Sequence, residues 1–307
     1  MKAAQLTSYG GQEVVQTVSD APKPSPAEGE VLVEVRAAAA NPFDWKVREG
    51  LTAELKLPAT LGGDLAGVVA ALGEGVTEFT VGQEVFGQAN ALSGQGSFAE
   101  FTPVKAVSLA AKPKSVDFTM AAALPLTSVS AYQALVEHAH LQAGQKVLIH
   151  GGAGGIGSIA IQLAKSLGAY VATTAVAAES DYVKGLGANE VVDYTTQDFS
   201  VLLQDFDVVY DTVGGETFEK SFKVLKPGGV VVSMAAKANP ELDAQYGVTS
   251  IGQFTRVTTE KLTKIAELVD AGKLKVNVDK AFPLDQAAEA LEYLKTGRPK
   301  GKVVILI

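Results

Sequence analysis

The residues Gly152-Ala153-Gly154-Gly155-Ile156-Gly157 are the stretch that decides the fold. They follow an apolar run, 146–150, and open a helical pattern, 156–167. A G-x-G-x-x-G motif between a strand and a helix is typical of a dinucleotide-binding turn. Gly152 would allow the tight turn, Gly154 would let a pyrophosphate approach the backbone, and Gly157 would let the helix approach its strand. The free N–H groups and the positive dipole end of that helix would then face the phosphates.

Length and composition restrict the class of protein. A chain of 307 residues is long enough for two domains. Apolar residues make up 47% and charged residues 20%, which is typical of a globular protein. The net charge of −8 argues against nucleic acid and anionic membrane surfaces as partners. The absence of cysteine excludes disulfides and thiolate zinc sites, and no long apolar run or signal peptide is found. We therefore predict a cytoplasmic protein.

The first ~120 residues contain short strand patterns separated by Gly and Pro turns. We predict a partly open β-barrel with few helices, its strands including 30–39, 65–72, 84–86 and 98–102. A helical stretch, 127–140, follows.

From Lys146 the pattern changes to alternating strands and helices, which predicts a doubly wound parallel sheet. The predicted strands are 146–150, 170–174, 190–192, 207–211 and 229–234, and the predicted helices are 156–167, 179–186 and 216–225. Two amphipathic helices, 261–271 and 284–294, precede a final apolar strand, 302–307. Because this strand lies far from the glycine motif, we predict that it returns to the first domain.

Seven segments match one family in order and spacing: 41–50, 61–69, 124–127, the glycine loop with 162–165, 186–188, 211–214 and 301–304. On these residues the chain resembles the zinc-independent medium-chain dehydrogenase/reductase family, and within it the quinone and enone (alkenal) reductases. The resemblance implies an α/β fold with a GroES-like β-barrel domain (1–122 and 262–307) and a Rossmann doubly wound parallel sheet domain (123–261). It also implies a homodimer joined through the Rossmann sheet.

The resemblance implies that no metal is bound. Zinc alcohol dehydrogenases of the wider family have Cys and His where this chain has Asn41 and Gly63, and neither replacement suits Zn²⁺. The histidines are His138, His140 and His150. The first two, at i and i+2, would point to different faces of a helix, so we expect packed or solvated histidines.

The end of the second predicted Rossmann strand bears on the choice of coenzyme. NAD-specific domains usually place an acid there to bind the ribose 2′-OH, whereas 172–176 contains none. We predict NADPH, with Thr173, Thr174 and Ser180 as nearby hydroxyls; the alternative for both threonines is that they are ordinary strand residues. Glu179 stands where some relatives have lysine, and its carboxylate would repel a 2′-phosphate.

The remaining coenzyme contacts are implied by the resemblance. Tyr194 matches a tyrosine near the adenosine. Lys302 would reach the pyrophosphate, unless it is a solvated charge, and Thr127 would lie beside the nicotinamide, unless its hydroxyl only satisfies the start of a helix. The nicotinamide crevice would be formed after the fourth and fifth strands by Val213, Gly214, Ser233, Met234 and Ala235.

The acceptor side has two candidate catalytic residues, since a reductase without zinc needs another group to stabilise negative charge on the acceptor. Asn41 could donate a hydrogen bond and Lys46 could supply an ammonium, although Lys46 could equally be a surface lysine. We expect Asp44 to cap a helix or to pair with Arg48, and Asp64 to order the Gly62-Gly63 loop.

The sequence thus predicts an NADPH-dependent oxidoreductase that transfers a hydride to a quinone or an α,β-unsaturated carbonyl. Within the family, the chain is similar to the enone reductases that have lysine at position 46, and this resemblance favours the enone. Two alternatives remain: a non-catalytic NADPH-binding redox sensor and an alcohol dehydrogenase. Since a fold does not determine a function, turnover of NADPH would separate them.

Overall fold

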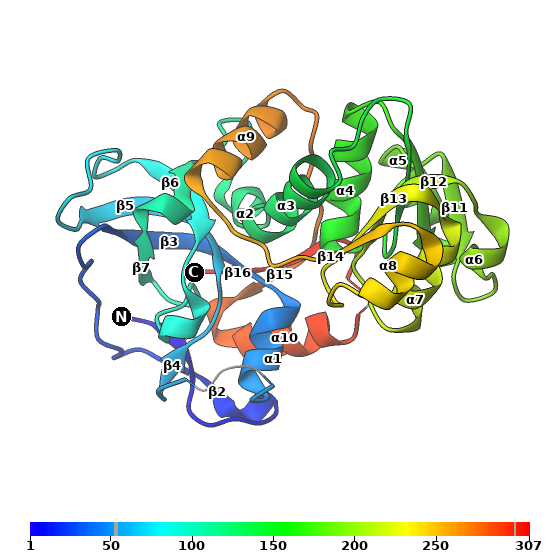
Figure 1. The fold of residues 1–307 in the computed structure, drawn as a ribbon. Helices are drawn as coiled ribbons and strands as arrows, with labels where there is room; N and C mark the ends of the chain where they lie inside the picture. Colours follow the sequence, from blue (N-terminus) through cyan, green and yellow to red (C-terminus); the bar gives the residue numbers. More distant parts are fainter. Residues whose placement is uncertain (52–54, 298) are drawn as a thin grey trace. The chain divides into compact units, whose positions relative to one another are not determined.

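The computed structural model describes residues 1–51, 55–297 and 299–307 (Figure 1). The chain divides into two compact units. Unit 1 comprises Met1–Leu126, Val257–Gly272 and Val276–Ile307, and unit 2 comprises Thr127–Arg256 and Lys273–Lys275. The domain limits predicted above, 122/123 and 261/262, fall near these divisions but leave Lys273–Lys275 in the barrel domain.

Unit 2 is built on a six-stranded parallel sheet with the order β11-β10-β9-β12-β13-β14. Its strands are β9 (Lys146–Ile149), β10 (Tyr170–Ala175), β11 (Glu190–Asp193), β12 (Phe206–Asp211), β13 (Leu225–Ser233) and β14 (Thr249–Gly252). The chain order therefore reverses between β9 and β12, where ligands bind in such sheets. The predicted doubly wound sheet is confirmed, and β14 was not predicted as a strand.

The helices of unit 2 are α4 (Gly155–Ser166), α5 (Ser180–Gly185), α6 (Phe199–Leu202), α7 (Glu216–Ser221) and α8 (Pro240–Tyr246). The helices predicted at 179–186 and 216–225 are shorter, because 3₁₀ turns at Ala177–Glu179 and Phe222–Val224 adjoin them. The helix predicted at 127–140 is α3 (Pro125–Tyr132), continued by a π-helical segment at Gln133–His138.

Unit 1 contains a seven-stranded sheet with the order β15-β16-β3-β5-β6-β8, in which β7 also pairs with β3. A small second sheet has the order β2-β1-β4. The strands are β1 (Ala3–Leu6), β2 (Val15–Val18), β3 (Glu30–Ala40), β4 (Ala59–Thr60), β5 (Asp64–Leu72), β6 (Glu84–Gln88), β7 (Phe101–Lys105), β8 (Leu109–Ala111), β15 (Val278–Pro283) and β16 (Lys302–Leu306). β16 pairs antiparallel with β3, which confirms the predicted return of the last strand to the first domain.

The strand predicted at 98–102 is wrong in its position, because β7 begins only at Phe101. Phe98 is buried and bonds two other segments: its N–H donates to the Leu61 carbonyl, and its carbonyl accepts from the N–H of Ala4. Its apolar side chain therefore marks a core position, not part of that strand.

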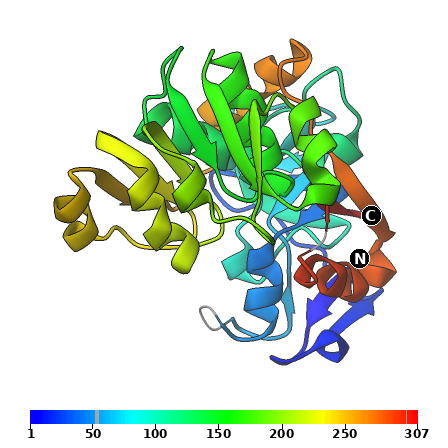
Figure 2. The same ribbon diagram turned by 90° about the vertical axis from the view of Figure 1, so that its right-hand side faces the viewer.

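The helices of unit 1 are α1 (Pro42–Arg48), α2 (Phe118–Ala122), α9 (Thr259–Asp270) and α10 (Ala287–Lys295). Figures 1 and 2 both show α10 beside α1. Ion pairs join these helices: Arg48 to Glu292 at 2.6 Å and Lys295 to Glu49 at 2.5 Å. Among the described residues, no helix has the length and hydropathy of a membrane-spanning segment.

Candidate functional site

The glycine loop joins β9 to α4 in unit 2, and its glycines differ in what surrounds them. A Cβ on Gly152 would lie 2.1 Å from Thr173 Oγ1, and one on Gly157 would lie 2.2 Å from the Gly151 carbonyl oxygen. A Cβ on Gly154 would meet one atom within 4 Å, Gly151 O at 3.4 Å. Internal packing thus requires glycine at 152 and 157, whereas the space beside Gly154 is left for something outside the loop.

Helix α4 begins at Gly155 with Gly154 at its N-cap and no capping hydrogen bond from a side chain of the described residues. The amides of the first turn of a helix have no acceptor inside the helix. Together with the dipole, they can hold the phosphates of a dinucleotide. Gly154, Gly155 and Ile156 are half-buried, so this turn is accessible. The residues present therefore fit a dinucleotide.

Thr173 and Thr174, predicted as hydroxyls for a 2′-phosphate, are placed differently. Both are buried in β10. The Thr173 hydroxyl donates to the Ile149 carbonyl at 2.7 Å, and the Thr174 oxygen accepts from the Gly151 N–H at 3.1 Å. That prediction is therefore wrong for these two residues: the Thr173 hydroxyl bonds a residue of β9 inside the sheet, and the Thr174 hydroxyl is buried against Gly151, beyond the end of β9. The alternative, ordinary strand residues, describes Thr173 well.

Beyond β10, the residues predicted near the adenosine are more accessible. Glu179 and Ser180 are half-buried, and Tyr194 is 59% exposed. No carboxylate occurs from Ala175 to Ala178. Thr127, at the start of unit 2, is buried.

The carboxyl ends of β12 and β13 are held together by Asp211, a residue that sequence reasoning placed only in a motif. Its carboxylate accepts from the N–H groups of Val213 and Gly214, both at 2.9 Å, and from the Ser233 hydroxyl at 2.6 Å. The Ser233 oxygen in turn accepts from the Ala235 N–H at 3.1 Å. The predicted crevice residues Val213, Gly214, Ser233, Met234 and Ala235 therefore belong to adjacent turns. Ser233 is buried and supports the turns, whereas Val213 is 55% exposed.

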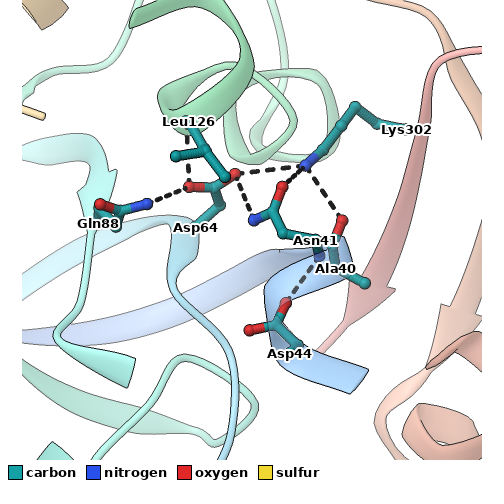
Figure 3. Close-up of polar contacts among 7 residues, drawn as sticks. All are labelled: Ala40, Asn41, Asp44, Asp64, Gln88, Leu126 and Lys302. Atoms are coloured by element: carbon teal, nitrogen blue, oxygen red, sulfur yellow. Dashed lines mark hydrogen bonds and ion pairs between the residues drawn. The ribbon is translucent and has the colours of Figure 1, made fainter. Parts of the chain in front are cut away.

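Unit 1 contains a polar cluster formed by Asn41, Asp44, Asp64 and Lys302 (Figure 3). All four side chains are buried. Lys302 Nζ lies 2.5 Å from Asn41 Oδ1, 3.1 Å from the Ala40 carbonyl oxygen and 3.4 Å from Asp64 Oδ2. These three contacts use the three donors of an ammonium. Neither expectation for Lys302 places it here, and a solvated charge is excluded because the side chain is buried.

Asn41 is fixed by this cluster from both ends of its amide. Its Nδ2 donates to Asp64 Oδ2 at 2.9 Å, while its oxygen accepts from Lys302. Asp64 also accepts from Gln88 Nε2 at 3.2 Å and from the Leu126 N–H at 3.1 Å. Asp64 therefore joins Asn41, Gln88 and Leu126 within unit 1, a larger role than ordering the Gly62-Gly63 loop.

Asp44 is a helix cap, as one of the two expectations had it. Its carboxylate accepts from the Asn41 N–H at 2.7 Å at the start of α1. The expected pairing with Arg48 is wrong, since Arg48 forms ion pairs with Glu49 and Glu292. Burial raises the pKa of Asp44 to about 7, and burial also raises the pKa of Asp64, although Lys302 opposes that rise.

Lys46 is exposed on α1, with Nζ 5.6 Å from the centroid of the Trp45 ring. It does not belong to the buried cluster. A group that contacts an acceptor must be accessible, and a surface lysine is accessible by definition. The exposure of Lys46 is therefore compatible with both expectations.

The buried cluster does not fit a metal ion. Carboxylate and amide oxygens could ligate one, but the Lys302 ammonium already lies among them, and a second cation there would be repelled. Across 1–51, 55–297 and 299–307, no three His, Cys, Asp or Glu side chains are grouped as metal ligands.

Two features could have been found in the sequence. Asp211 ends an apolar strand and precedes Gly214, a pattern in which a carboxylate accepts from turn amides. Lys302 begins an apolar strand, and a lysine there needs a buried partner if the strand is central. Its partners lie 238 and 261 positions earlier, so no local pattern identifies them.

Comparisons with known proteins agree with this architecture. The alcohol dehydrogenase GroES-like domain family matches residues 27–114, and the zinc-binding dehydrogenase family matches residues 186–305. The chain is 40% identical to the 2-methylene-furan-3-one reductase of Solanum lycopersicum and 38% identical to the chloroplastic NADPH-dependent alkenal/one oxidoreductase of Arabidopsis thaliana. Each alignment covers 99% of this chain and 79% of the relative.

The solved structure of the Escherichia coli quinone oxidoreductase complexed with NADPH is also similar. It superposes with a TM-score of 0.90 at 29% identity and covers 100% of both chains.

Proposed function

Since this chain belongs to the medium-chain dehydrogenase/reductase family and is an oxidoreductase, we propose that it reduces a quinone or an α,β-unsaturated carbonyl with NADPH and without zinc. The observation that carries the proposal is the glycine loop. Its first and last glycines are required by internal packing, while Gly154 leaves accessible space beside the uncapped start of α4. The amides and the positive dipole end of that helix start suit the charge and the hydrogen-bonding demand of a coenzyme diphosphate.

The preference for NADPH over NADH rests on the end of β10. The segment Ala175–Ala178 has no carboxylate to bind a ribose 2′-OH or to repel a 2′-phosphate. Ser180 is the hydroxyl that we retain for the phosphate, because those of Thr173 and Thr174 are buried and already hydrogen-bonded. Glu179 opposes this preference through its charge. The relative from Arabidopsis thaliana is named as NADPH-dependent, which supports the same choice.

Zinc-independent reduction is supported by the polar cluster of unit 1. Asn41 stands where zinc alcohol dehydrogenases of the wider family have a zinc ligand, and its oxygen accepts from Lys302. We propose that Lys302 stabilises this part of unit 1 in place of its predicted contact with the pyrophosphate. Tyr194, Thr127 and the β12–β13 turns stay in the proposed coenzyme site, as the resemblance implies.

A bound NADPH supplies hydride donation, and the substrate gains one further proton. For an enone the hydride goes to the β-carbon and the proton, from water or an unidentified donor, to the α-carbon. We propose that Lys46 stabilises the negative charge on the carbonyl oxygen, because its ammonium is accessible on α1. Asn41 holds the start of α1 through its contacts with Asp64 and Lys302.

Of the alternatives, a non-catalytic sensor is disfavoured because the named relatives are reductases and oxidoreductases. An alcohol dehydrogenase is disfavoured because no Lewis acid suits the buried cluster. A homodimer joined through the Rossmann sheet and a cytoplasmic location remain part of the proposal.

The proposal is tested by titrating the protein with NADPH and NADH and by following absorbance loss with a panel of quinones, alkenals and enones. Gly154→Ala should weaken coenzyme binding at least about tenfold while leaving the fold intact, since it occupies space that only a ligand needs. Gly185→Ala is the control, because a Cβ there has open space in α5. Equal affinity of both variants would contradict the proposed site.

The coenzyme preference has its own variant. Glu179→Gln removes the opposing charge and should improve NADPH binding a few-fold while leaving NADH binding nearly unchanged. A protein that binds NADH more tightly in both forms would reverse the choice of coenzyme.

A further inference from the structure

His150 lies between the last residue of β9 and the glycine loop, and it is completely buried. Its ring nitrogens contact two hydroxyls: Nδ1 lies 3.2 Å from Thr174 Oγ1, and Nε2 lies 3.1 Å from Ser221 Oγ. These hydroxyls come from β10 and α7. The histidine therefore joins β10 and α7.

The direction of these hydrogen bonds follows from their outer partners. The Ser221 hydroxyl donates to the Thr217 carbonyl at 2.7 Å, so its oxygen accepts from His150. The histidine hydrogen is therefore on Nε2, and Nδ1 is an acceptor. Consequently the Thr174 hydroxyl donates to Nδ1, while its oxygen accepts from the Gly151 N–H at 3.1 Å.

The segment held in this way positions the rest of the loop. Gly151 has φ +69°, and its carbonyl accepts from the Gly154 N–H at 3.1 Å. The His150 carbonyl also accepts from the Thr212 hydroxyl at 2.8 Å, which ties it to the turn after β12. Displacement of Gly151 would therefore move Gly154, beside which the diphosphate is proposed to lie.

We propose that His150, as the neutral Nε2–H tautomer, is a positioning residue that acts through Thr174 to hold Gly151 and thereby shapes the loop for the coenzyme diphosphate. The part that concerns the coenzyme rests on the proposed function. The hydrogen-bond relay itself does not.

The surroundings of His150 favour the neutral form. Burial lowers its pKa to about 4, although the Asp211 carboxylate opposes this. The Phe199 ring packs edge-on against the imidazole at 4.5 Å between centroids, and each ring nitrogen contacts a neutral hydroxyl. Protonation would make Nδ1 a donor, so that two donors would face each other. The Thr174 hydroxyl would then need another acceptor.

Thr174→Val tests the relay, because it removes the hydroxyl and keeps the shape of the side chain. The loss of the two hydrogen bonds of this hydroxyl, to His150 Nδ1 and from the Gly151 N–H, should raise the NADPH dissociation constant at least about tenfold, with kcat at saturating NADPH little changed. Thr174→Ser keeps a hydroxyl and should restore binding close to the wild-type value. Thr102→Val is the matched control: Thr102 is equally buried in a strand, and its hydroxyl donates to the Gln95 carbonyl in unit 1.

A second measurement reads the loop without coenzyme. Hydrogen exchange of the Gly151 amide, followed by NMR in the free protein, should be faster in Thr174→Val than in the wild type, in Thr174→Ser and in Thr102→Val. Two-bond ¹⁵N spectra should show one of the three histidines as a buried Nε2–H tautomer at pH 7.

The outcomes separate the two proposals. If the wild-type protein binds neither coenzyme, the proposed function and the coenzyme part of this inference both fall, while Gly151 exchange still decides whether the relay exists. If the wild type binds but Thr174→Val binds equally well, the positioning role alone is overturned. A buried Nδ1–H tautomer would overturn the relay directly, and a lower melting temperature with unchanged affinity would reduce Thr174 to a structural residue.

Discussion

Each unit buries a polar cluster, and the two clusters solve the same problem with different chemistry. Unit 1 encloses charges: Asp44 and Asp64 are balanced in part by Lys302. Unit 2 encloses a neutral relay in which His150 connects two hydroxyls. A buried charge is costly unless it is paired, whereas a neutral group needs only hydrogen bonds. Unit 1 should therefore be the more sensitive to removal of a single partner.

The two clusters also titrate in opposite directions. Burial raises the pKa of the Asp44 acid and lowers that of the His150 base, because in both cases it disfavours the charged form. One region should therefore lose stability towards alkaline pH and the other towards acidic pH. Four predictions sharpen or break this comparison, from the largest expected effect to the smallest.

Lys302→Met should give the largest loss, about 3–5 kcal/mol in the free energy of unfolding, since it leaves Asp64 buried without its cation. Urea unfolding measures it. Lys300→Met, which changes an exposed lysine nearby, should have almost no effect. The double variant with Asp64→Asn should recover part of the loss. A loss as small as that of Lys300→Met would show that the charged cluster is no more sensitive than the surface.

Asp44→Asn should remove a pH dependence. The folded-state pKa of about 7 lies above the ordinary 3.8, so the stabilising contribution is complete below pH 3.8 and is lost as the pH rises through 7. The facing charges are Asp64 and Lys302. The difference in unfolding free energy between wild type and variant should therefore fall with rising pH, by at most about 1.4 kcal/mol per pH unit. A difference independent of pH would mean that Asp44 does not titrate in this range.

His150→Phe should show the opposite dependence. The folded-state pKa of about 4 lies below 6.5, so the contribution of His150 is present above pH 6.5 and is lost as the pH falls through 4. The facing charge is Asp211. The larger phenyl ring adds an offset to the unfolding free energy that does not depend on pH. On acidification from pH 6.5 to about 4, the stability advantage of the wild type should shrink. If the pH dependence of the stability difference had the same sign for Asp44→Asn and His150→Phe, the contrast between the units would be lost.

Lys46→Ala should have the smallest effect on folding, within about 0.5 kcal/mol, because the side chain is exposed. If Lys46 contacts the acceptor, kcat/KM for quinones or enones should nevertheless fall roughly tenfold or more while coenzyme affinity stays unchanged. Lys56→Ala, which removes another exposed lysine of unit 1, is the control. An unchanged kcat/KM for every acceptor would remove Lys46 from the proposed site.

The alternation of strands and helices in unit 2 was predictable from the sequence, apart from β14, because its signals are local. The glycine motif lies within six residues, and the alternation of apolar runs with helical patterns predicts parallel strands. The residues that Gly152 and Gly157 pack against also lie near the loop. Gly151 precedes the loop in the chain, and Thr173 pairs with Ile149 in the neighbouring strand.

The polar clusters were not predictable in the same way, because their partners are distant in the sequence. His150 meets Ser221 71 positions later, and Lys302 meets Asn41 261 positions earlier. The threonines of β10 show the consequence. Residue type and position favoured a phosphate contact, whereas in the structure the Thr173 hydroxyl donates to the Ile149 carbonyl and the Thr174 oxygen accepts from the Gly151 N–H.

The pairing of β16 with β3 has a consequence for synthesis on the ribosome. Asp64 is synthesised early, but Lys302, the lysine that forms an ion pair with it, belongs to β16. Most of unit 2 is contiguous in the chain and is complete well before that strand is made. The buried ion pair of unit 1 can therefore be completed only after Lys302 has been synthesised.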